Sequence, residues 1–362
     1  MEILDTTINL LLLAVITVLL VEFLLPNMPQ IVTAISNLLQ TSSYPLQNYS
    51  IITSSQATIP GQESTTAVTT IQSSENYSAL VNYTLGLINK DRAEYNLAPV
   101  SLSAEPSGQQ HADSMLEYSY FSHWDIFGLK PYMRYTLLGG LGAVSENIAY
   151  RSSYVCVASL CTGSINPKYA LQRMEYSMMY NDSACCNNGH RDNILNPYHN
   201  MVSIGIAYDS SRIYLVEDFI DNYINWRAGY PAFYNGYVAI IGNLTKYNLS
   251  SILISYDKPV SGMTQLQLNA TSDYSYGKVI AGVVPNASYY YSSVDTIYAS
   301  IYSVKGNAFD IEFDMRNITD KYGAGEYTIM LWLNSNSTNS FVGSTYTIFI
   351  NSSGAQVFPS NV

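Results

Sequence analysis

Three short strings decide how this chain is interpreted: FSH at residues 121–123, SENIA at residues 145–149 and GHRDNIL at residues 189–195. The chain of 362 residues has only four histidines, and His123 and His190 lie in these strings. Glu146 lies in the middle string, although charged residues make up only 12% of the chain. Imidazole and carboxylate groups are therefore concentrated in one region, which is the candidate site.

In order and spacing, the strings resemble the bacterial and archaeal branch of the CAP superfamily, whose shared unit is the SCP-like extracellular domain. In that family a helix with His-Ala precedes Phe-Ser-His, Gly-Glu-Asn-Ile-Ala and Gly-His-Arg-x-Asn-Ile-Leu. Here His111 precedes Ala112 and lies twelve residues before His123, and Ser145 replaces the first Gly of the middle string. The resemblance covers about residues 80–220 and implies a three-layer α-β-α sandwich.

The resemblance also implies a cleft with a tetrad of two histidines and two acidic residues. His123, His190 and Glu146 match three members of this tetrad. The fourth member commonly lies three residues after a Trp, on the helix before the second His.

Met179 takes the place of that Trp, so Asp182 matches the acidic position. Glu175 lies one heptad earlier on nearly the same helix face and is the alternative.

Two imidazoles and two carboxylates are the minimum set for a divalent metal with an open coordination position. We therefore expect that His123 and His190 can hold an ion such as Zn²⁺, with Glu146 and Asp182 acting through water. The alternative is that these groups only hydrogen-bond one another across the cleft. If the site is catalytic, the metal or Glu146 would activate a water molecule.

The bulk composition favours an exported protein that does not bind nucleic acid. The net charge of -11 and the pI near 4.7 lack the basic face that nucleic-acid binding requires. The 33 Tyr residues can keep a surface soluble with few ions, because each ring carries a hydroxyl. Eleven Asn-x-Ser/Thr sequences, dense in the C-terminal third, predict a glycoprotein.

The first 78 residues divide into two segments that precede the predicted globular part. Residues 8–25 form an apolar run of 18 residues before Pro26, so we expect a transmembrane signal-anchor over residues 1–27. A cleaved signal peptide, and hence a secreted protein, is the alternative. Residues 28–78 form a Ser/Thr-rich linker that acts as a flexible tether. The remainder is then an ectodomain at the cell surface.

Two hydrophobic periods predict an α+β fold with two domains. Helical spacing predicts helices from residue 80 to before Pro99, over 103–118 with Ser103 as N-cap, and over about 168–181. Residues 201–208 and 212–219 predict paired strands. We assign residues 79–225 to the CAP-like domain. Period-two runs then predict an all-β, immunoglobulin-like sandwich over residues 235–352, with a tyrosine corner at Tyr327.

The four cysteines are typical of an oxidising exterior. Cys156 and Cys161 lie in a small-residue insert, and Cys185 and Cys186 are adjacent. We expect two disulfide bonds that join the insert to the adjacent pair, and metal binding by the four cysteines is the alternative.

Three functions are compatible with these features. The first is a membrane-anchored extracellular protein whose His/acidic cleft binds a small molecule, a lipid or a divalent metal. The second is a metal-assisted hydrolase of peptides or envelope polymer, and the third is a structural or adhesive envelope glycoprotein that contacts glycans or proteins. No Ser or Cys has a recognisable base partner in the sequence. This favours a binding protein over an enzyme.

Overall fold

The computed structural model describes residues 76–357, apart from 158–159, 287–292 and 336–338. The predicted signal-anchor and nearly all of the predicted linker lie outside the described residues. Within the described part, no helix is long and apolar enough to cross a membrane. The chain has a mixed helix and strand content with several separate sheets, which confirms the predicted α+β class.

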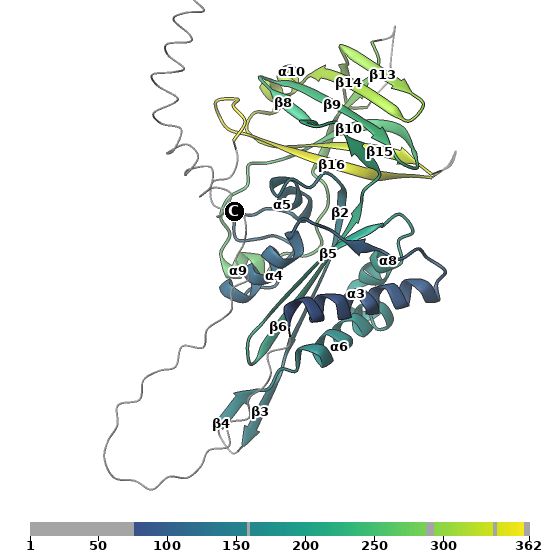
Figure 1. The fold of residues 1–362 in the computed structure, drawn as a ribbon. Helices are drawn as coiled ribbons and strands as arrows, with labels where there is room; N and C mark the ends of the chain where they lie inside the picture. Colours follow the sequence, from purple (N-terminus) through teal and green to yellow (C-terminus); the bar gives the residue numbers. More distant parts are fainter. Residues whose placement is uncertain (1–75, 158–159, 287–292, 336–338, 358–362) are drawn as a thin grey trace, which may run out of the picture. The chain divides into compact units, whose positions relative to one another are not determined.

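The first sheet has four strands in the order β1-β5-β6-β2 (Figure 1). Strand β5 pairs antiparallel with β6, as predicted, and β6 pairs antiparallel with β2. The short strand β1 pairs parallel with β5. The strands are β1 (Ser101–Leu102), β2 (Ala143–Ser152), β5 (Met201–Tyr208) and β6 (Arg212–Asp221).

Helices cover both faces of this sheet, and the alternation along β6 shows which helices share a face. Leu215 packs in one buried cluster with α3 (Tyr77–Glu94) and α6 (Pro167–Tyr180). Val216 packs in another cluster with α4 (Ser107–Tyr118), while α5 (Pro131–Leu137) packs near the end of the same face. Successive side chains of a strand point to opposite faces. Glu217 and Asp218 therefore lie on opposite faces of the sheet.

The helix starts follow local capping chemistry, with one correction to the prediction. Asn76 and Asn166 cap α3 and α6, because each side chain accepts a backbone N–H of the first turn. The predicted cap at Ser103 is wrong, since α4 begins at Ser107. The hydroxyl of Ser103 instead donates to the Glu105 carboxylate at 2.5 Å.

Four small elements complete this part of the chain. Strands β3 (Tyr154–Val157) and β4 (Leu160–Gly163) form a hairpin from the predicted insert. Helices α7 (Ser183–Cys186) and α8 (Gly189–Ile194) follow α6. The string GHRDNIL therefore forms α8, apart from its last residue.

Two further sheets follow and enclose one apolar core (Figure 1). One sheet has the order β12-β11-β10-β15-β16, and the other has the order β13-β14-β9-β7 with β8 paired to β9. The predicted period-two runs, near 237–242, 252–256, 278–284, 309–315, 327–333 and 346–350, fall in strands, and only Met315 lies just past the end of its strand. In contrast, β7, β8, β12 and β13 were not predicted. The strands are β7 (Ile224–Trp226), β8 (Ala232–Tyr234), β9 (Tyr237–Leu244), β10 (Asn248–Asp257), β11 (Lys278–Val284), β12 (Asp295–Tyr298), β13 (Ile301–Lys305), β14 (Ala308–Asp314), β15 (Gly325–Asn334) and β16 (Ser340–Ile350).

The turn before β15 has the predicted tyrosine corner. The hydroxyl of Tyr327 donates to the carbonyl oxygen of Gly323 at 2.5 Å, four residues upstream. A short helix, α10 (Arg316–Tyr322), leads into this turn.

The connection from β10 to β11, residues 258–277, leaves the β-rich part and packs on the first part of the chain. It contains α9 (Gln265–Leu268), which a Thr264–Gln267 capping box begins. Leu268 is buried in the cluster that contains α4, and Tyr274 packs against the cluster of Leu129 and Tyr132. We call residues 258–277 the crossover segment. Long connections of this kind are often functional.

Candidate functional site

The three strings and the crossover segment line one pocket of about 980 Å³. His123, Glu146, Asp182 and His190 all lie on its wall. The crossover segment contributes residues 271–274 to the same wall. The pocket therefore combines side chains from positions that lie about 150 residues apart in the chain.

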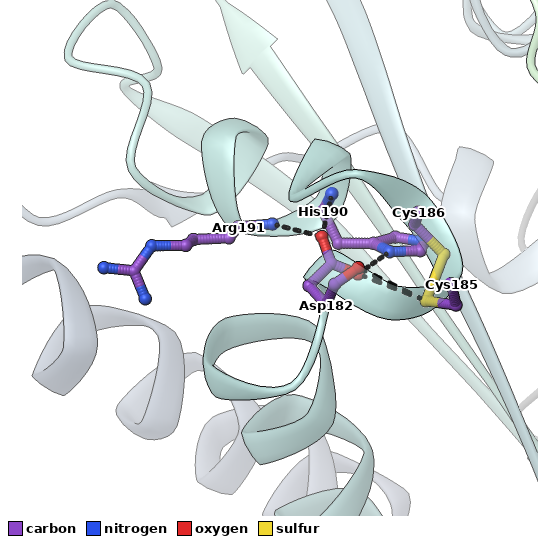
Figure 2. The surroundings of a disulfide bond; sticks show 5 residues. All are labelled: Asp182, Cys185, Cys186, His190 and Arg191. Atoms are coloured by element: carbon purple, nitrogen blue, oxygen red, sulfur yellow. Dashed lines mark hydrogen bonds and ion pairs between the residues drawn. A yellow bond between two sulfur atoms is a disulfide. The ribbon is translucent and has the colours of Figure 1, made fainter.

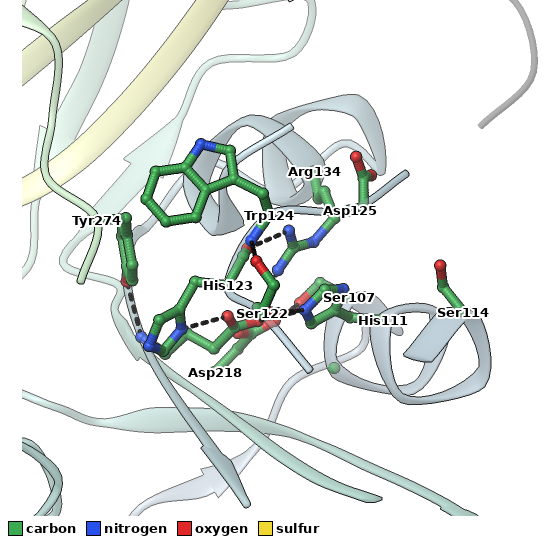
Figure 3. Close-up of polar contacts among 12 residues, drawn as sticks. Ser107, His111, Ser114, Ser122, His123, Trp124, Asp125, Arg134, Asp218 and Tyr274 are labelled. Atoms are coloured by element: carbon green, nitrogen blue, oxygen red, sulfur yellow. Dashed lines mark hydrogen bonds and ion pairs between the residues drawn. The ribbon is translucent and has the colours of Figure 1, made fainter. Parts of the chain in front are cut away.

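His123 and Glu146 form the first half of the site, and Figure 3 shows His123 with its neighbours Arg134 and Tyr274. Nδ1 of His123 lies 2.8 Å from Oε1 of Glu146, and Nη2 of Arg134 donates to Oε2 at 2.6 Å. Arg134 also donates to the backbone carbonyl oxygen of His123 at 2.8 Å. Arg134 on α5 thus orients both members of the pair.

Burial dominates the electrostatics of this half. It lowers the pKa of His123 to about 4, with the Arg134 charge acting in the same direction. Burial also raises the pKa of Glu146 to about 7, although the neighbouring Arg134 opposes this shift. The imidazole of His123 is therefore neutral near neutral pH. When Glu146 is ionised, Nδ1 carries the hydrogen and Nε2 keeps its lone pair.

His111 lies behind this pair, as a buried helix residue. Its Nε2 donates to the carbonyl oxygen of Ser122 at 2.8 Å and lies 3.9 Å from Oε2 of Glu146. Burial lowers the pKa of His111 well below its usual value. His111 therefore supports the FSH loop from within the structure and does not line the pocket.

Asp182 and His190 form the second half of the site (Figure 2). Oδ1 of Asp182 lies 2.7 Å from Nδ1 of His190. Oδ2 accepts the backbone N–H groups of His190 at 2.8 Å and of Arg191 at 3.2 Å. Asp182 thus orients the imidazole and satisfies two first-turn amides of α8.

Two asparagines of the strings join α8 to β2. Asn193 donates to the carbonyl oxygen of Ser145 at 3.1 Å and to Oδ1 of Asn147 at 3.0 Å. Asn147 donates in turn to the carbonyl oxygen of His190 at 3.2 Å. These contacts hold SENIA and GHRDNIL side by side.

The structure distinguishes the two candidates for the second acidic residue, Glu175 on α6 and Asp182 just after it. Asp182 contacts His190, whereas Glu175 is buried under the sheet and faces Glu217. Burial, and next the Glu217 charge, raises the pKa of Glu175 well above its usual value. Burial raises the pKa of Glu217 as well. Burial thus favours the protonated form of both carboxyl groups.

The predicted disulfide pairing is wrong. Cys185 and Cys186 are bonded to each other (Figure 2), so neither is bonded to the insert. In the insert, β3 and β4 pair so that Cys156 lies opposite Cys161 in the antiparallel register. The hairpin therefore places these two positions opposite each other on its own two strands.

One group of potential metal ligands stands out among the described residues. The candidate ligand atoms of Asp182, Cys185, Cys186 and His190 all lie within 4.8 Å of one another, and the group could hold a metal ion. His123 and Glu146 do not belong to that group. The donors at both histidines nevertheless suit a metal, since each Nδ1 is held by a carboxylate and leaves Nε2 as the ligand atom.

Sequence reasoning missed the contribution of the crossover segment. The hydroxyl of Tyr274 accepts the backbone N–H of Glu146 at 2.9 Å, and its ring centroid lies 5.0 Å from that of His123. Thr271 and Asn269 bond the FSH string through Ser122 and Phe121. The available signal was the length of the connection between two period-two runs.

No family model and no curated protein matches the chain. A search of solved structures found an extracellular protein containing a SCP domain from Bacillus anthracis str. Ames, with 23% sequence identity and a TM-score of 0.30. The match covers 40% of this chain and 40% of that one.

Proposed function

We propose that this protein is an extracellular, CAP-like binding module whose pocket holds a small polar ligand between two His–carboxylate pairs. The observation that carries the proposal is that His123 and His190 line one pocket, each with Nδ1 held by a carboxylate. Within the described residues, Nε2 of neither histidine has a hydrogen-bond partner. Two fixed imidazole nitrogens are therefore available to a ligand or a divalent ion.

The ligand we propose has a ring with an apolar face and polar substituents, such as a glycan unit of the cell envelope. Phe121 and Tyr150 line the pocket, are 41% and 43% exposed, and lie with their ring centroids 6.2 Å apart. The remaining wall carries hydroxyl, amide and carboxylate groups, including Asn181 and Asp273. Such a wall can contact a ring face while it hydrogen-bonds the ring substituents.

We propose binding in preference to hydrolysis because neither His123 nor Glu146 is suited to act as a general base. A general base works best when its pKa lies near the working pH, and the pKa of His123 is about 4. The Glu146 carboxylate is fully buried and is engaged by Arg134 and His123. The Glu146 pKa of about 7 would suit a base, but its side chain has no exposed surface and its two oxygens are already bonded to His123 and Arg134.

Histidine NMR tests the proposal directly, since the chain has only four histidines. The four imidazole Cε1–H signals can be assigned by single substitution and followed under non-reducing conditions. The probes are Zn²⁺ alone and a set of neutral disaccharides. We expect one of these probes to shift the His123 and His190 signals together in a saturable titration.

His199 serves as the internal reference. Its two ring nitrogens are bonded to Asp221 at 2.7 Å and Asn193 at 2.9 Å, and it does not line the pocket. The matched variants are His123→Gln and Tyr274→Ala, both of which should weaken binding of that probe. Binding that leaves the His123 and His190 signals unmoved would place the ligand elsewhere and contradict the proposal.

A further inference from the structure

We infer that the adjacent cysteines make one end of the pocket a redox-controlled metal site. In the oxidised protein Cys185 and Cys186 form a disulfide and offer no thiolate. When the bond is reduced, two thiolates join His190 and Asp182 as donors to one thiophilic ion such as Zn²⁺. This inference concerns the reduced protein and is independent of ligand binding by the oxidised pocket.

The donor set is the first argument. Two thiolates, one imidazole and one carboxylate are four donors of the kinds that Zn²⁺ takes in tetrahedral sites. Their candidate atoms already lie within 4.8 Å of one another. Sγ of Cys185 is 3.6 Å from Oδ1 of Asp182, and that same oxygen is 2.7 Å from Nδ1 of His190. Small side-chain movements can bring these atoms to ligand distances of about 2.0–2.3 Å.

The fold does not rely on the Cys185–Cys186 bond. The disulfide joins residues with a sequence separation of 1, so it closes no loop in the unfolded chain. The stabilisation that a disulfide derives from loop closure is therefore absent here. In addition, α8 is held by Asp182 and by the contacts of Asn193 and Asn147. Reduction can change the site without unfolding the domain.

The four donor side chains are accessible from the pocket. Cys185 is exposed, and Cys186 and His190 are partly exposed, whereas Asp182 is buried. All four line the pocket, so a reductant and an ion can reach the sulfur atoms from solvent. The backbone N–H groups of His190 and Arg191 hold Oδ2 of Asp182, which leaves Oδ1 facing the imidazole and Sγ of Cys185 as a donor for the ion.

A dithiol can reduce the Cys185–Cys186 disulfide. The dithiol supplies two electrons and two protons, the Cys185–Cys186 bond breaks, and the reductant closes its own disulfide. Metal binding then displaces the thiol protons to solvent. An oxidant that restores the disulfide removes both thiolate donors and releases the ion. The site is thus filled only under reducing conditions.

Cobalt binding to the full chain tests the inference. Co²⁺ gives a thiolate-to-metal charge-transfer absorption that a site of only His and Asp does not give. After reduction with dithiothreitol and its anaerobic removal, we expect this band to saturate at one Co²⁺ per chain and to disappear when Zn²⁺ is added. The oxidised protein should bind at least about 100-fold more weakly and show no such band.

Matched variants assign the ligands. Cys185→Ser/Cys186→Ser should abolish the band, and His190→Ala should weaken binding at least about tenfold. Cys156→Ser/Cys161→Ser should leave both the band and its redox dependence unchanged. Circular dichroism of the reduced protein checks that it stays folded.

Two results would overturn the inference. One is a folded, reduced protein that gives no cobalt–thiolate band. The other is a band that persists in the Cys185→Ser/Cys186→Ser variant and is lost in Cys156→Ser/Cys161→Ser, which would assign the thiolates to the insert. Neither result affects ligand binding by the oxidised pocket, which is measured without reductant.

Discussion

The two His–carboxylate pairs have nearly the same local geometry but different supports. The Nδ1-to-carboxylate distances are 2.8 Å for His123–Glu146 and 2.7 Å for His190–Asp182. Glu146 is held by Arg134, twelve residues away, and by Tyr274, 128 residues away. Asp182 is held by backbone amides eight and nine residues away. Similar hydrogen bonds can thus be built by tertiary packing or by one local turn.

This difference predicts that the first pair tolerates loss of its supports much less well than the second. Removing Arg134 would leave the buried Glu146 carboxylate without its cation, whereas Asp182, although also buried, is held by neutral backbone amides. The following experiments test that difference.

The largest effect is expected for Arg134→Met. The substitution leaves the buried Glu146 carboxylate without its cation and should cost about 3–5 kcal/mol in the free energy of unfolding. Urea denaturation measures the change. The matched variant is Arg191→Met, beside the second pair, where Arg191 bonds the Met179 carbonyl oxygen and the Tyr95 hydroxyl. There the expected loss is below about 1.5 kcal/mol, and equal losses would remove the proposed difference.

The protonation of His123 should differ greatly from that of a free imidazole. We expect its NMR titration to have a midpoint near pH 4, because burial and Arg134 disfavour the charged form. The unfolded chain protonates near its usual value of 6.5, so the contribution of His123 to stability is lost as the pH falls from about 6.5 to about 4. A midpoint near 6.5 would show that the first pair is not desolvated.

Glu146 should act in the opposite direction. Its folded-state pKa of about 7 lies above its usual value of 4.5, so its contribution to stability is lost as the pH rises through this window. Between about pH 4.5 and 6.5, the folded pair holds its proton on Glu146 while the unfolded chain holds one on His123. The pH dependences that His123 and Glu146 give to the free energy of unfolding therefore largely cancel. Glu146→Gln removes one of them, and thermal melts of this variant should show stability rising with pH over that range.

A smaller effect is expected for Asp182→Ala. The substitution removes the acceptor of two first-turn amides of α8 and should cost about 1–2 kcal/mol, as loss of a helix cap does. The control is Asp192→Ala, an exposed carboxylate in the same turn, for which we expect a change within about 0.5 kcal/mol. Chemical denaturation of both variants measures the difference. Equal effects would show that Asp182 does not hold α8.

The smallest effect is expected for Cys185→Ser/Cys186→Ser under non-reducing conditions. Because the bond joins adjacent residues and closes no loop, its loss should change the free energy of unfolding by less than about 1 kcal/mol. Differential scanning calorimetry can measure this change. A loss of several kcal/mol would show that the second pair depends on the disulfide.

Several features of this site could be predicted from local sequence. The resemblance to the CAP pattern, with Met179 in the place of the Trp, gives Asp182 the acidic position, and Asp182 lies just after α6 and contacts His190. The period-two run over residues 212–219 predicts which side chains of β6 share a face. These predictions depend on groups that lie within a few turns or one strand of each other. Local backbone geometry determines such relations whatever the rest of the chain does.

The sequence by itself therefore determined which strings carry the candidate residues, which side chains of β6 share a face, and most of the elements that carry the His–carboxylate pairs. Only the tertiary structure decided that Arg134 and Tyr274 complete the first pair, that Glu175 faces Glu217, and that Cys185 bonds Cys186. Most of these contacts depend on how separate elements pack against one another. A hydrophobic period indicates which face of an element is buried, but it does not indicate which residue of another element meets that face.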